Sequence, residues 1–212
     1  MSSKKEFNLR EDVRWPVVPG NYVVDDATCS VAICTLSTKI DVDTPFAIKG
    51  RCMTENIGIE KVILNIISNP NIRFLILCGF EVPGHYTGEC FKALKKYGVN
   101  LDSRRINKAL GPIPIIGNLP LKAIERFRSQ IEIVDLIGIR DPTKIKRVVL
   151  NCVENNPGTY PATPFIVKAK RKLVQPQLIS YNVSILPEYK IGLNPFTSMI
   201  GIDVKIKRDQ RS

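Results

Sequence analysis

The only histidine in this chain of 212 residues, His85, lies in a short loop that is rich in glycine. The loop, residues 80–88, reads FEVPGHYTG and follows the continuous apolar run FLILC at 74–78. Such a run is typical of a strand buried on both faces of a parallel sheet, and ligands of these sheets bind beyond the carboxyl ends of the strands. Gly84 and Gly88 would let the backbone approach a bulky ligand closely. We therefore take His85 as the first candidate for a functional residue.

Several kinds of chemistry are open to a single imidazole. A structural zinc ion normally takes four protein ligands, and the chain has no second histidine. Nucleophilic catalysis of the Ser–His–Asp type would need a motif such as G-x-S-x-G, which the sequence lacks. General acid–base catalysis remains open, with Glu55 or Glu81 as the partner of His85. One imidazole also suffices to bind a cofactor that carries most of its own metal ligands, such as a haem or a corrinoid.

The six cysteines give no support to a zinc ribbon or a redox motif. Both would need a close C-x-x-C pair to bring two thiolates to one centre, and no such pair is present. We expect reduced thiols that pack as small hydrophobic side chains. The cysteines are Cys29, Cys34, Cys52, Cys78, Cys90 and Cys152.

Composition and charge narrow the class of protein. The formal net charge of +11 raises nucleic acid as a partner, but we expect none, because the basic residues are spread along the chain without a recognisable nucleic-acid-binding motif. No apolar stretch approaches the roughly 20 residues of a transmembrane helix. Residues 1–10 are too polar and charged for a secretory signal. These features predict a cytoplasmic protein without membrane insertion.

The order of the predicted elements indicates an α/β fold. An extended segment at 15–22 and a loop that contains Thr44, Pro45 and Gly50 complete the first half of the chain. The alternation of strands with helices favours a Rossmann-like parallel sheet flanked by helices. Strands are predicted at 31–37, 74–78 and 131–138, and helices at 57–67, 89–97, 121–130 and 142–155.

The chain divides by character into three parts. Residues 1–14 are polar and predict a flexible arm, and residues 15–160 carry the α/β pattern. Helical periodicity then disappears, so residues 161–212 predict a β-rich C-terminal extension. This extension would either pack on the main sheet or serve association, including formation of a homo-oligomer. Its expected strands are 165–168, 178–186 and 199–206.

Further candidates for ligand contacts follow from their positions at strand ends and in the loop of His85. The helix after that loop begins with N–H groups that could meet an anion or a rim of amides. Tyr86 could cover the face of a ligand or simply pack the loop, and for the others an ordinary capping or turn role is the alternative. The candidates are Ser37, Thr38, Thr54, Glu55, Gly79, Gly84, Tyr86, Gly88, Gly111 and Pro114.

Four segments of the chain carry a resemblance to a known family. They are 51–94 (RCMTENIGIEKVILNIISNPNIRFLILCGFEVPGHYTGECFKAL), 15–24 (WPVVPGNYVV), 111–120 (GPIPIIGNLP) and 125–137 (ERFRSQIEIVDLI). Together they resemble the corrinoid-binding A subunit of tetrahydromethanopterin S-methyltransferase from methanogenic archaea. The similarity is colinear and extends over the α/β part of the chain.

The resemblance implies a cofactor, a metal ligand and partners. The chain would hold a cobalamin-type corrinoid (a cobamide), and the histidine of the E-V-x-G-H loop, here His85, would be the lower axial ligand of its cobalt. The cobalt would accept a methyl group from methyl-tetrahydromethanopterin and pass it to coenzyme M. The chain would therefore be a methyl carrier, served by methyl-donor and methyl-acceptor methyltransferase subunits.

Two departures from related patterns matter. The A subunits of this family commonly end in a membrane-spanning helix, whereas residues 168–212 are polar and β-like, which suggests a soluble homologue. The signature D-x-H-x-x-G of other corrinoid modules fits His85 and Gly88, but Pro83 occupies the position of the aspartate. The carboxylate that would tune the imidazole must then come from elsewhere, and Glu81 and Glu55 are the candidates.

Two other functions stay open on the sequence alone. One is a stand-alone enzyme that binds a nucleotide or pterin and uses Glu81 and His85 as an acid–base pair. The other is a basic interaction protein whose C-terminal extension binds nucleic acid. Neither accounts for the colinear resemblance, so we favour the corrinoid carrier.

Overall fold

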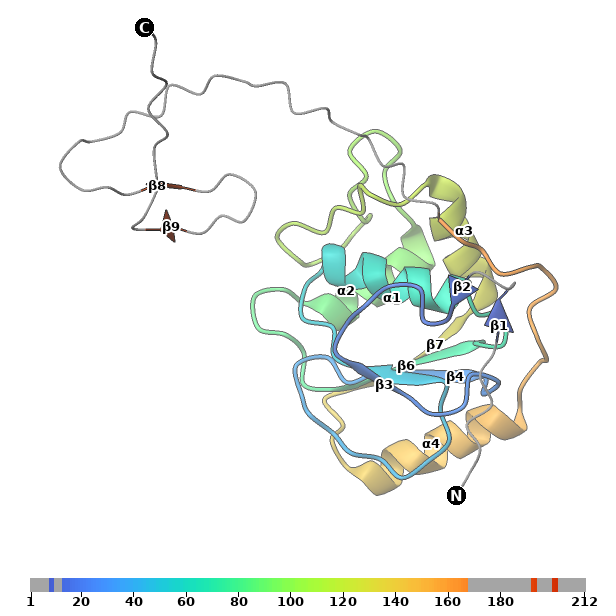
Figure 1. The fold of residues 1–212 in the computed structure, drawn as a ribbon. Coiled ribbons are helices and arrows are strands. Elements are labelled where there is room, and N and C mark those ends of the chain that lie inside the picture. The colour runs from blue at the N-terminus through green and yellow to red at the C-terminus, as the bar shows by residue number, and fades with distance from the viewer. Residues whose placement is uncertain (1–7, 10–12, 168–191, 194–199, 202–212) are drawn as a thin grey trace, which may run out of the picture. The chain divides into compact units, whose positions relative to one another are not determined.

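The structure is a computed structural model that describes residues 8–9, 13–167, 192–193 and 200–201 (Figure 1). Contacts within the chain divide it into two units, residues 1–169 and residues 170–212. All candidate site residues belong to the first unit.

A five-stranded sheet forms the centre of the first unit. Its strands lie in the order β3–β5–β4–β6–β7, and every neighbouring pair is parallel except β3 with β5. β4 and β6 are buried along their whole length, as expected for strands covered on both faces. The bounds are β3 (Tyr22–Val24), β4 (Val31–Cys34), β5 (Ile48–Gly50), β6 (Phe74–Gly79) and β7 (Glu132–Ile137).

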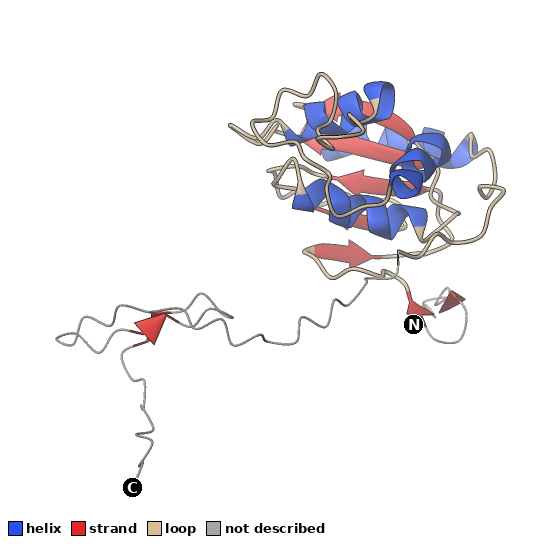
Figure 2. Cartoon of the chain, turned by 90° about the horizontal axis from the view of Figure 1, so that it is seen from above, coloured by secondary structure: helices blue, strands red, loops and turns tan. Residues whose placement is uncertain are grey.

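Helices cover both faces of this sheet. α1 (Ile57–Ile67), α2 (Thr87–Tyr97) and α3 (Leu121–Gln130) lie on one face, and α4 (Pro142–Glu154) lies on the other (Figure 1). Figure 2 views the sheet from the side of the first three helices. The unit is therefore built of three layers, with the sheet in the middle.

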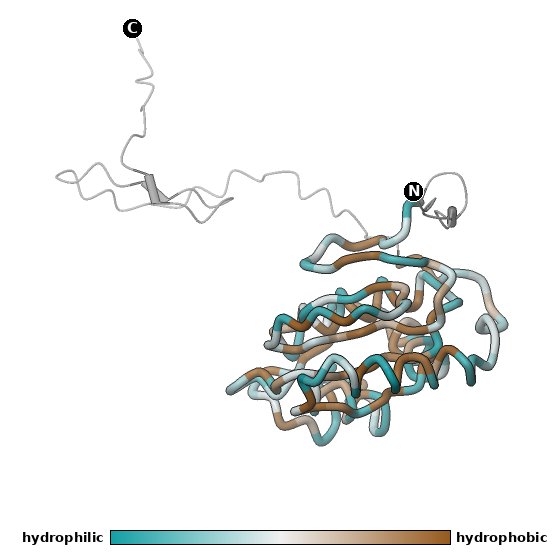
Figure 3. Tube along the Cα trace, turned by 90° about the horizontal axis from the view of Figure 1, so that it is seen from below, coloured by the Kyte–Doolittle hydropathy of each residue, from teal (hydrophilic) through white to brown (hydrophobic). Residues whose placement is uncertain are grey.

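The hydrophobic core lies between these layers. On α1, Ile59, Ile63 and Ile66 recur at helical spacing and are fully buried against the sheet. The rings of Phe91 on α2 and Phe127 on α3 pack together with their centroids 6.3 Å apart. Figure 3 shows the matching hydropathy, with long hydrophobic stretches along the central strands.

Most of the predicted elements are confirmed, with small shifts at their ends. The strand predicted at 31–37 ends at Cys34, because Leu36 takes a left-handed φ of 49° in the turn that follows. The helix predicted at 89–97 begins two residues earlier, at Thr87. The helices predicted near 57–67, 121–130 and 142–155 and the strand near 131–138 are present.

The prediction missed β3 and β5, which were taken as an extended segment and as loop. Each strand has three residues, and β5 forms by pairing with β4 while β3 adds an antiparallel edge strand. No helix lies between β4 and β5, so the alternation of strand and helix is incomplete. The fold is therefore a mixed α/β fold with a mostly parallel sheet.

Residues at the end of the first unit also differ from the prediction. The strand expected at 165–168 is not formed over 165–167. Instead, the Phe165 N–H donates to the Ile67 carbonyl oxygen at 3.0 Å, which holds this segment to the end of α1. Because its side chain packs on the core, the segment needs no strand partner to be held.

The two ends of the chain are described only in part. β1 (Asn8–Leu9) pairs antiparallel with β2 (Val13–Arg14), and in the second unit β8 (Gly192–Leu193) pairs antiparallel with β9 (Ile200–Gly201). The strand predicted at 178–186 lies outside the described residues, as do most of residues 1–14. The flexible arm, the boundary at residue 160 and the β-rich extension stay predictions.

Candidate functional site

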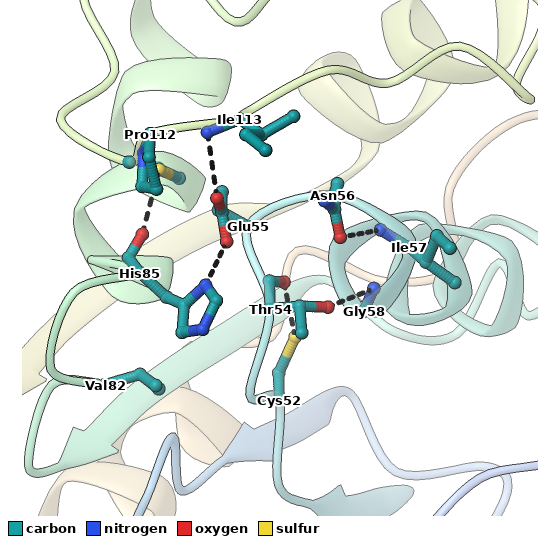
Figure 4. Close-up of polar contacts among 12 residues, drawn as sticks. Cys52, Thr54, Glu55, Asn56, Ile57, Gly58, Val82, His85, Pro112 and Ile113 are labelled. Atoms are coloured by element: carbon teal, nitrogen blue, oxygen red, sulfur yellow. Dashed lines mark hydrogen bonds and ion pairs between the residues drawn. The ribbon is translucent and has the colours of Figure 1, made fainter.

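The loops after β4, β5 and β6 meet at the carboxyl edge of the sheet, and they carry most of the candidate residues. Residues 35–39 follow β4, residues 51–56 lead from β5 into α1, and residues 80–86 lead from β6 into α2. A fourth segment, 109–115, lies beside them through contacts with Glu55. Figure 4 shows the polar contacts at this edge.

His85 and Glu55 form the central contact of this edge. The His85 Nδ1 atom lies 2.6 Å from the Glu55 Oε2 atom, although the two residues are 30 positions apart. The imidazole side chain is 45% exposed, whereas the Glu55 side chain is only 2% exposed. Among the described residues, no hydrogen bond is made by the other ring nitrogen, Nε2. The ring is thus held at one nitrogen from inside and open at the other.

Glu55 is itself fixed by the backbone. Its Oε1 atom accepts a hydrogen bond from the Ile113 N–H at 2.9 Å. Burial would raise the pKa of Glu55, but hydrogen bonds from the backbone N–H groups of Glu55 and Ile113 and from His85 outweigh it, so the pKa lies below its usual value. The carboxylate therefore stays ionised beside the ring.

Gly111 allows this close arrangement. A Cβ atom at this position would lie 2.7 Å from the Glu55 Cγ atom, 2.7 Å from the His85 carbonyl oxygen and 2.9 Å from the Cys90 sulfur. No side chain fits there without a shift of backbone atoms. The glycine thus lets segment 109–115 lie directly against both residues of the pair.

Glu81, the other candidate carboxylate, has a different role. Its Oε1 atom accepts hydrogen bonds from the N–H groups of Val82 and Gly88, both at 2.9 Å, and its Oε2 atom accepts one from Glu89 at 3.0 Å. The side chain thereby caps the start of α2. The prediction that these N–H groups could meet an anion was wrong for Gly88 and Glu89, because a carboxylate of the chain already occupies them. The acid–base pair of Glu81 with His85 was also wrong, since the ring contacts Glu55.

The loop that carries His85 is a tight turn. The N–H groups of His85 and Tyr86 both donate to the Val82 carbonyl oxygen, at 3.1 and 3.0 Å. Gly84 has a φ of +77° and Tyr86 a φ of +49°, both in the left-handed region. Gly84 has open space around it, and Tyr86 is exposed. Both residues therefore lie on the free surface beside the ring.

Three other candidates join the first two loops. The Ser37 hydroxyl donates to the Phe80 carbonyl oxygen at 2.9 Å, and the Thr38 Oγ1 atom accepts from the Phe80 N–H at 2.8 Å. Gly79 has a φ of +80°, and a Cβ atom there would lie 2.6 Å from the Thr35 carbonyl oxygen. These residues hold the loops together, which is a positioning role.

Thr54 and Pro114 are used by turns and caps. The Thr54 Oγ1 atom accepts a hydrogen bond from the Gly58 N–H at 2.9 Å in the first turn of α1. The Pro114 carbonyl oxygen accepts one from the Ile106 N–H at 2.8 Å. For both residues the structure gives the ordinary alternative expected from the sequence.

Sequence reasoning missed the exposed apolar side chains of this edge. Met53 and Ile57 flank Glu55 in the chain, and Leu110, Ile113 and Ile115 belong to the segment that contacts it. All five are more than 40% exposed. Exposed apolar residues that gather in one place mark a binding surface, but in the sequence they look like loop or core residues.

Cysteines and metal clusters add nothing to the site. All six cysteines are buried and unpaired, as predicted, and burial raises the pKa of Cys78 to about 12 and that of Cys90 to about 11. In the part of the chain that the structure describes, no group of three or more His, Cys, Asp or Glu side chains could hold a metal ion. An isolated imidazole therefore fits only a metal that arrives with other ligands.

Comparison with known proteins places the chain in a family. The sequence model for the A subunit of tetrahydromethanopterin S-methyltransferase matches residues 9–176. The type 1 A subunit of this methyltransferase from Methanothermobacter marburgensis is 50% identical over 159 residues, which are 74% of this chain and 67% of that protein. The type 2 A subunit from Methanothermobacter thermautotrophicus is 46% identical over 157 residues, 73% of this chain and 86% of that protein.

The corresponding A subunit from Methanocaldococcus jannaschii is 48% identical over 159 residues, which are 73% of this chain and 66% of that protein. Within the described residues, no helix is both long and apolar enough to cross a membrane. The resemblance drawn from the four sequence segments is thus confirmed over a colinear match, and the chain belongs to the family of A subunits of tetrahydromethanopterin S-methyltransferase.

Proposed function

We propose that this chain is a corrinoid carrier and that His85 binds the cobalt of a cobamide through Nε2. The observation that supports this most directly is the pair of His85 and Glu55, in which one ring nitrogen is held by a buried carboxylate and the other is open. When bound, the corrinoid supplies the methyl-transfer chemistry at its cobalt. The residues of the chain supply the ligand, its orientation and the surface around it.

Glu55 sets the protonation of the ring. A carboxylate only accepts hydrogen bonds, so Nδ1 must carry the hydrogen that lies between them. In a neutral imidazole the other nitrogen then has its lone pair free for a metal. A carboxylate behind a metal-binding histidine also raises the basicity of the ligand. Glu55 therefore takes the role that the aspartate has in the D-x-H-x-x-G signature, from a different loop.

The exposed apolar side chains provide a surface for a large planar ring. Met53 and Ile57 on one side and Ile113 and Ile115 on the other are too exposed for core residues. Covering them with a macrocycle would remove apolar area from water, which favours binding. Gly84 and Tyr86, beside the imidazole, are placed to lie against the same ligand.

Partners follow from the names of the relatives. Each of these is called one lettered subunit of a methyltransferase, which implies further subunits. We infer that this chain likewise receives a methyl group from one methyltransferase partner and gives it to another. Its own described residues offer a ligand for a metal and no acid–base pair for substrate chemistry, which favours a carrier.

The experiment compares cobalamin binding by the wild-type chain and by His85→Ala, with affinity and cobalt spectra as readouts. We expect the variant to bind more weakly and to lose the spectral signature of nitrogen ligation from the protein. Lys144→Ala, an exposed change on α4 at the opposite face, serves as the control and should behave as wild type. Unchanged affinity together with unchanged spectra in His85→Ala would remove His85 from the ligand role.

A further inference from the structure

A second feature near the site is a cavity of about 470 Å³ between α1 and the sheet. Its volume falls within the roughly 300–1,000 Å³ of ordinary ligand pockets. The inner wall is apolar and includes Ala32 and Cys34 of β4, Ile48 of β5 and Val62 and Ile66 of α1. No contact in the proposed cobalt site uses this space, so the cavity needs an occupant of its own.

The mouth of the cavity carries two cations. Arg51 and Lys61 both line it and both are exposed. Neither forms an ion pair with a carboxylate of the described residues. The Arg51 guanidinium instead lies 3.2 Å from the Met53 sulfur. An apolar interior below two unneutralised cations fits a flat apolar group that bears an anion.

The roof of the cavity is fixed in advance. Residues 19–22 line the cavity, and the segment before them is tied to Asn65 of α1. The Val18 N–H donates to the Asn65 Oδ1 atom at 2.8 Å, the Asn65 Nδ2 atom donates to the Val18 carbonyl oxygen at 3.0 Å, and Trp15 Nε1 donates to the Asn65 carbonyl oxygen at 2.8 Å. A pocket held open in this way loses little conformational entropy on binding.

The cavity lies next to the cobalt site in the chain. Residues 51–54 line it, and the next residue, Glu55, holds His85. Figure 4 shows the segment that carries Cys52, Thr54 and Glu55 passing beside the imidazole. A ligand bound at His85 could therefore extend into the cavity around this one segment.

We propose that the cavity receives the nucleotide tail of the corrinoid, with its benzimidazole-type base against the apolar wall and its phosphate between Arg51 and Lys61. This assignment rests on the proposed function. When a histidine takes the lower position on the cobalt, the cofactor's own base is displaced and needs another place. The cavity matches that group in size, in apolar interior and in charge.

The test compares two probes, cobalamin and cobinamide, which has the same ring without the nucleotide. The wild-type chain should bind cobalamin about tenfold or more tightly than cobinamide. Val62→Phe fills the cavity and should abolish this preference, while cobinamide binding stays unchanged. Leu64→Phe, on the same helix but outside the cavity lining, is the matched control and should keep the preference.

A second variant leaves the interior intact. Arg51→Ala with Lys61→Ala changes only exposed residues and should lower the affinity for cobalamin about threefold to tenfold, with no effect on cobinamide. If Val62→Phe folds and still prefers cobalamin as strongly as wild type, the cavity assignment is overturned while the cobalt site stands.

Failure of the proposed function would give a different result, in which the wild-type chain binds neither corrinoid. The tail alone, a dimethylbenzimidazole ribonucleotide, is then titrated into wild type and Val62→Phe, with NMR shifts as the readout. Binding to wild type that the variant loses supports the cavity as a nucleotide site. Equal binding, or none, overturns it.

Discussion

Glu55 and Glu81 are two carboxylates at the same edge of the sheet with different partners. Glu81 directs both oxygens to three backbone N–H groups at the start of α2. Glu55 gives one oxygen to a backbone N–H and the other to the His85 ring. The partners therefore separate a carboxylate that stabilises a helix start from one that orients an imidazole.

Each carboxylate also has its own glycine. A Cβ atom at Gly88 would lie 2.8 Å from the Glu81 Oε2 atom, and one at Gly111 would lie 2.7 Å from the Glu55 Cγ atom. In both places the backbone approaches where a side chain would not fit. The two regions are thus built with similar means, and only the exposed imidazole makes one of them a site for ligands.

The largest expected effect on stability comes from Glu81→Ala. The change leaves the N–H groups of Val82, Gly88 and Glu89 without their carboxylate and should lower the free energy of unfolding by about 2–3 kcal/mol. Urea denaturation measures it, with Glu125→Ala, an exposed change on α3, as the control. A loss as small as that of the control would mean that Glu81 is no cap.

The second prediction concerns Glu55→Gln. The amide can still accept from Ile113, so the fold should stay close to wild type, but the ring loses its carboxylate and corrinoid affinity should fall about tenfold to 100-fold. Spectroscopic titration with cobalamin measures the affinity. Glu81→Gln is the matched control, and an equal loss of affinity in it would break the distinction between the two carboxylates.

Gly111→Ala tests the contact between segment 109–115 and the pair. The added methyl group meets atoms at 2.7–2.9 Å, so the free energy of unfolding should fall by about 1–2 kcal/mol. Gly117→Ala is the control, because there the nearest atom is 3.9 Å away. Denaturant titration of both variants measures the difference, and equal stability would show that the segment can move away without cost.

The pH dependence of stability should reflect the lowered pKa of Glu55. Since its folded pKa lies below the ordinary value of 4.5, the contribution is complete above that pH and is lost as the pH falls through the folded pKa. Wild type should therefore lose stability more steeply than Glu55→Gln below pH 4.5. Unfolding free energies measured across this range check it, and parallel curves would contradict it.

Local sequence signals were sufficient for the longer elements of the fold. α1 begins where Asn56 accepts from the Ile57 N–H, and α4 begins where Asp141 accepts from the Thr143 N–H. Together with regular apolar spacing, such caps make helices visible in a sequence. β3 and β5 were missed because three residues carry no periodicity and because their pairing depends on distant strands.

The site could be predicted only in part, for the same reason. His85 and Glu55 were both candidates, but their contact across 30 positions is set by the packing of α1 on the sheet. The sequence therefore could not choose between Glu55 and Glu81. The exposed apolar side chains around Glu55 were also out of reach, because a residue's exposure is decided by the fold.

An exposed carboxylate gives the scale against which both buried contacts are judged. Lys92 lies 2.8 Å from Glu89 and 2.6 Å from Asp135, and all three side chains are about a third to a half exposed. Water and salt screen such contacts, so Lys92→Met should cost under about 1 kcal/mol of unfolding free energy, and this cost should shrink at high salt. Denaturation at low and high salt measures both effects. A cost as large as that of Glu81→Ala would mean that exposure does not separate these carboxylates.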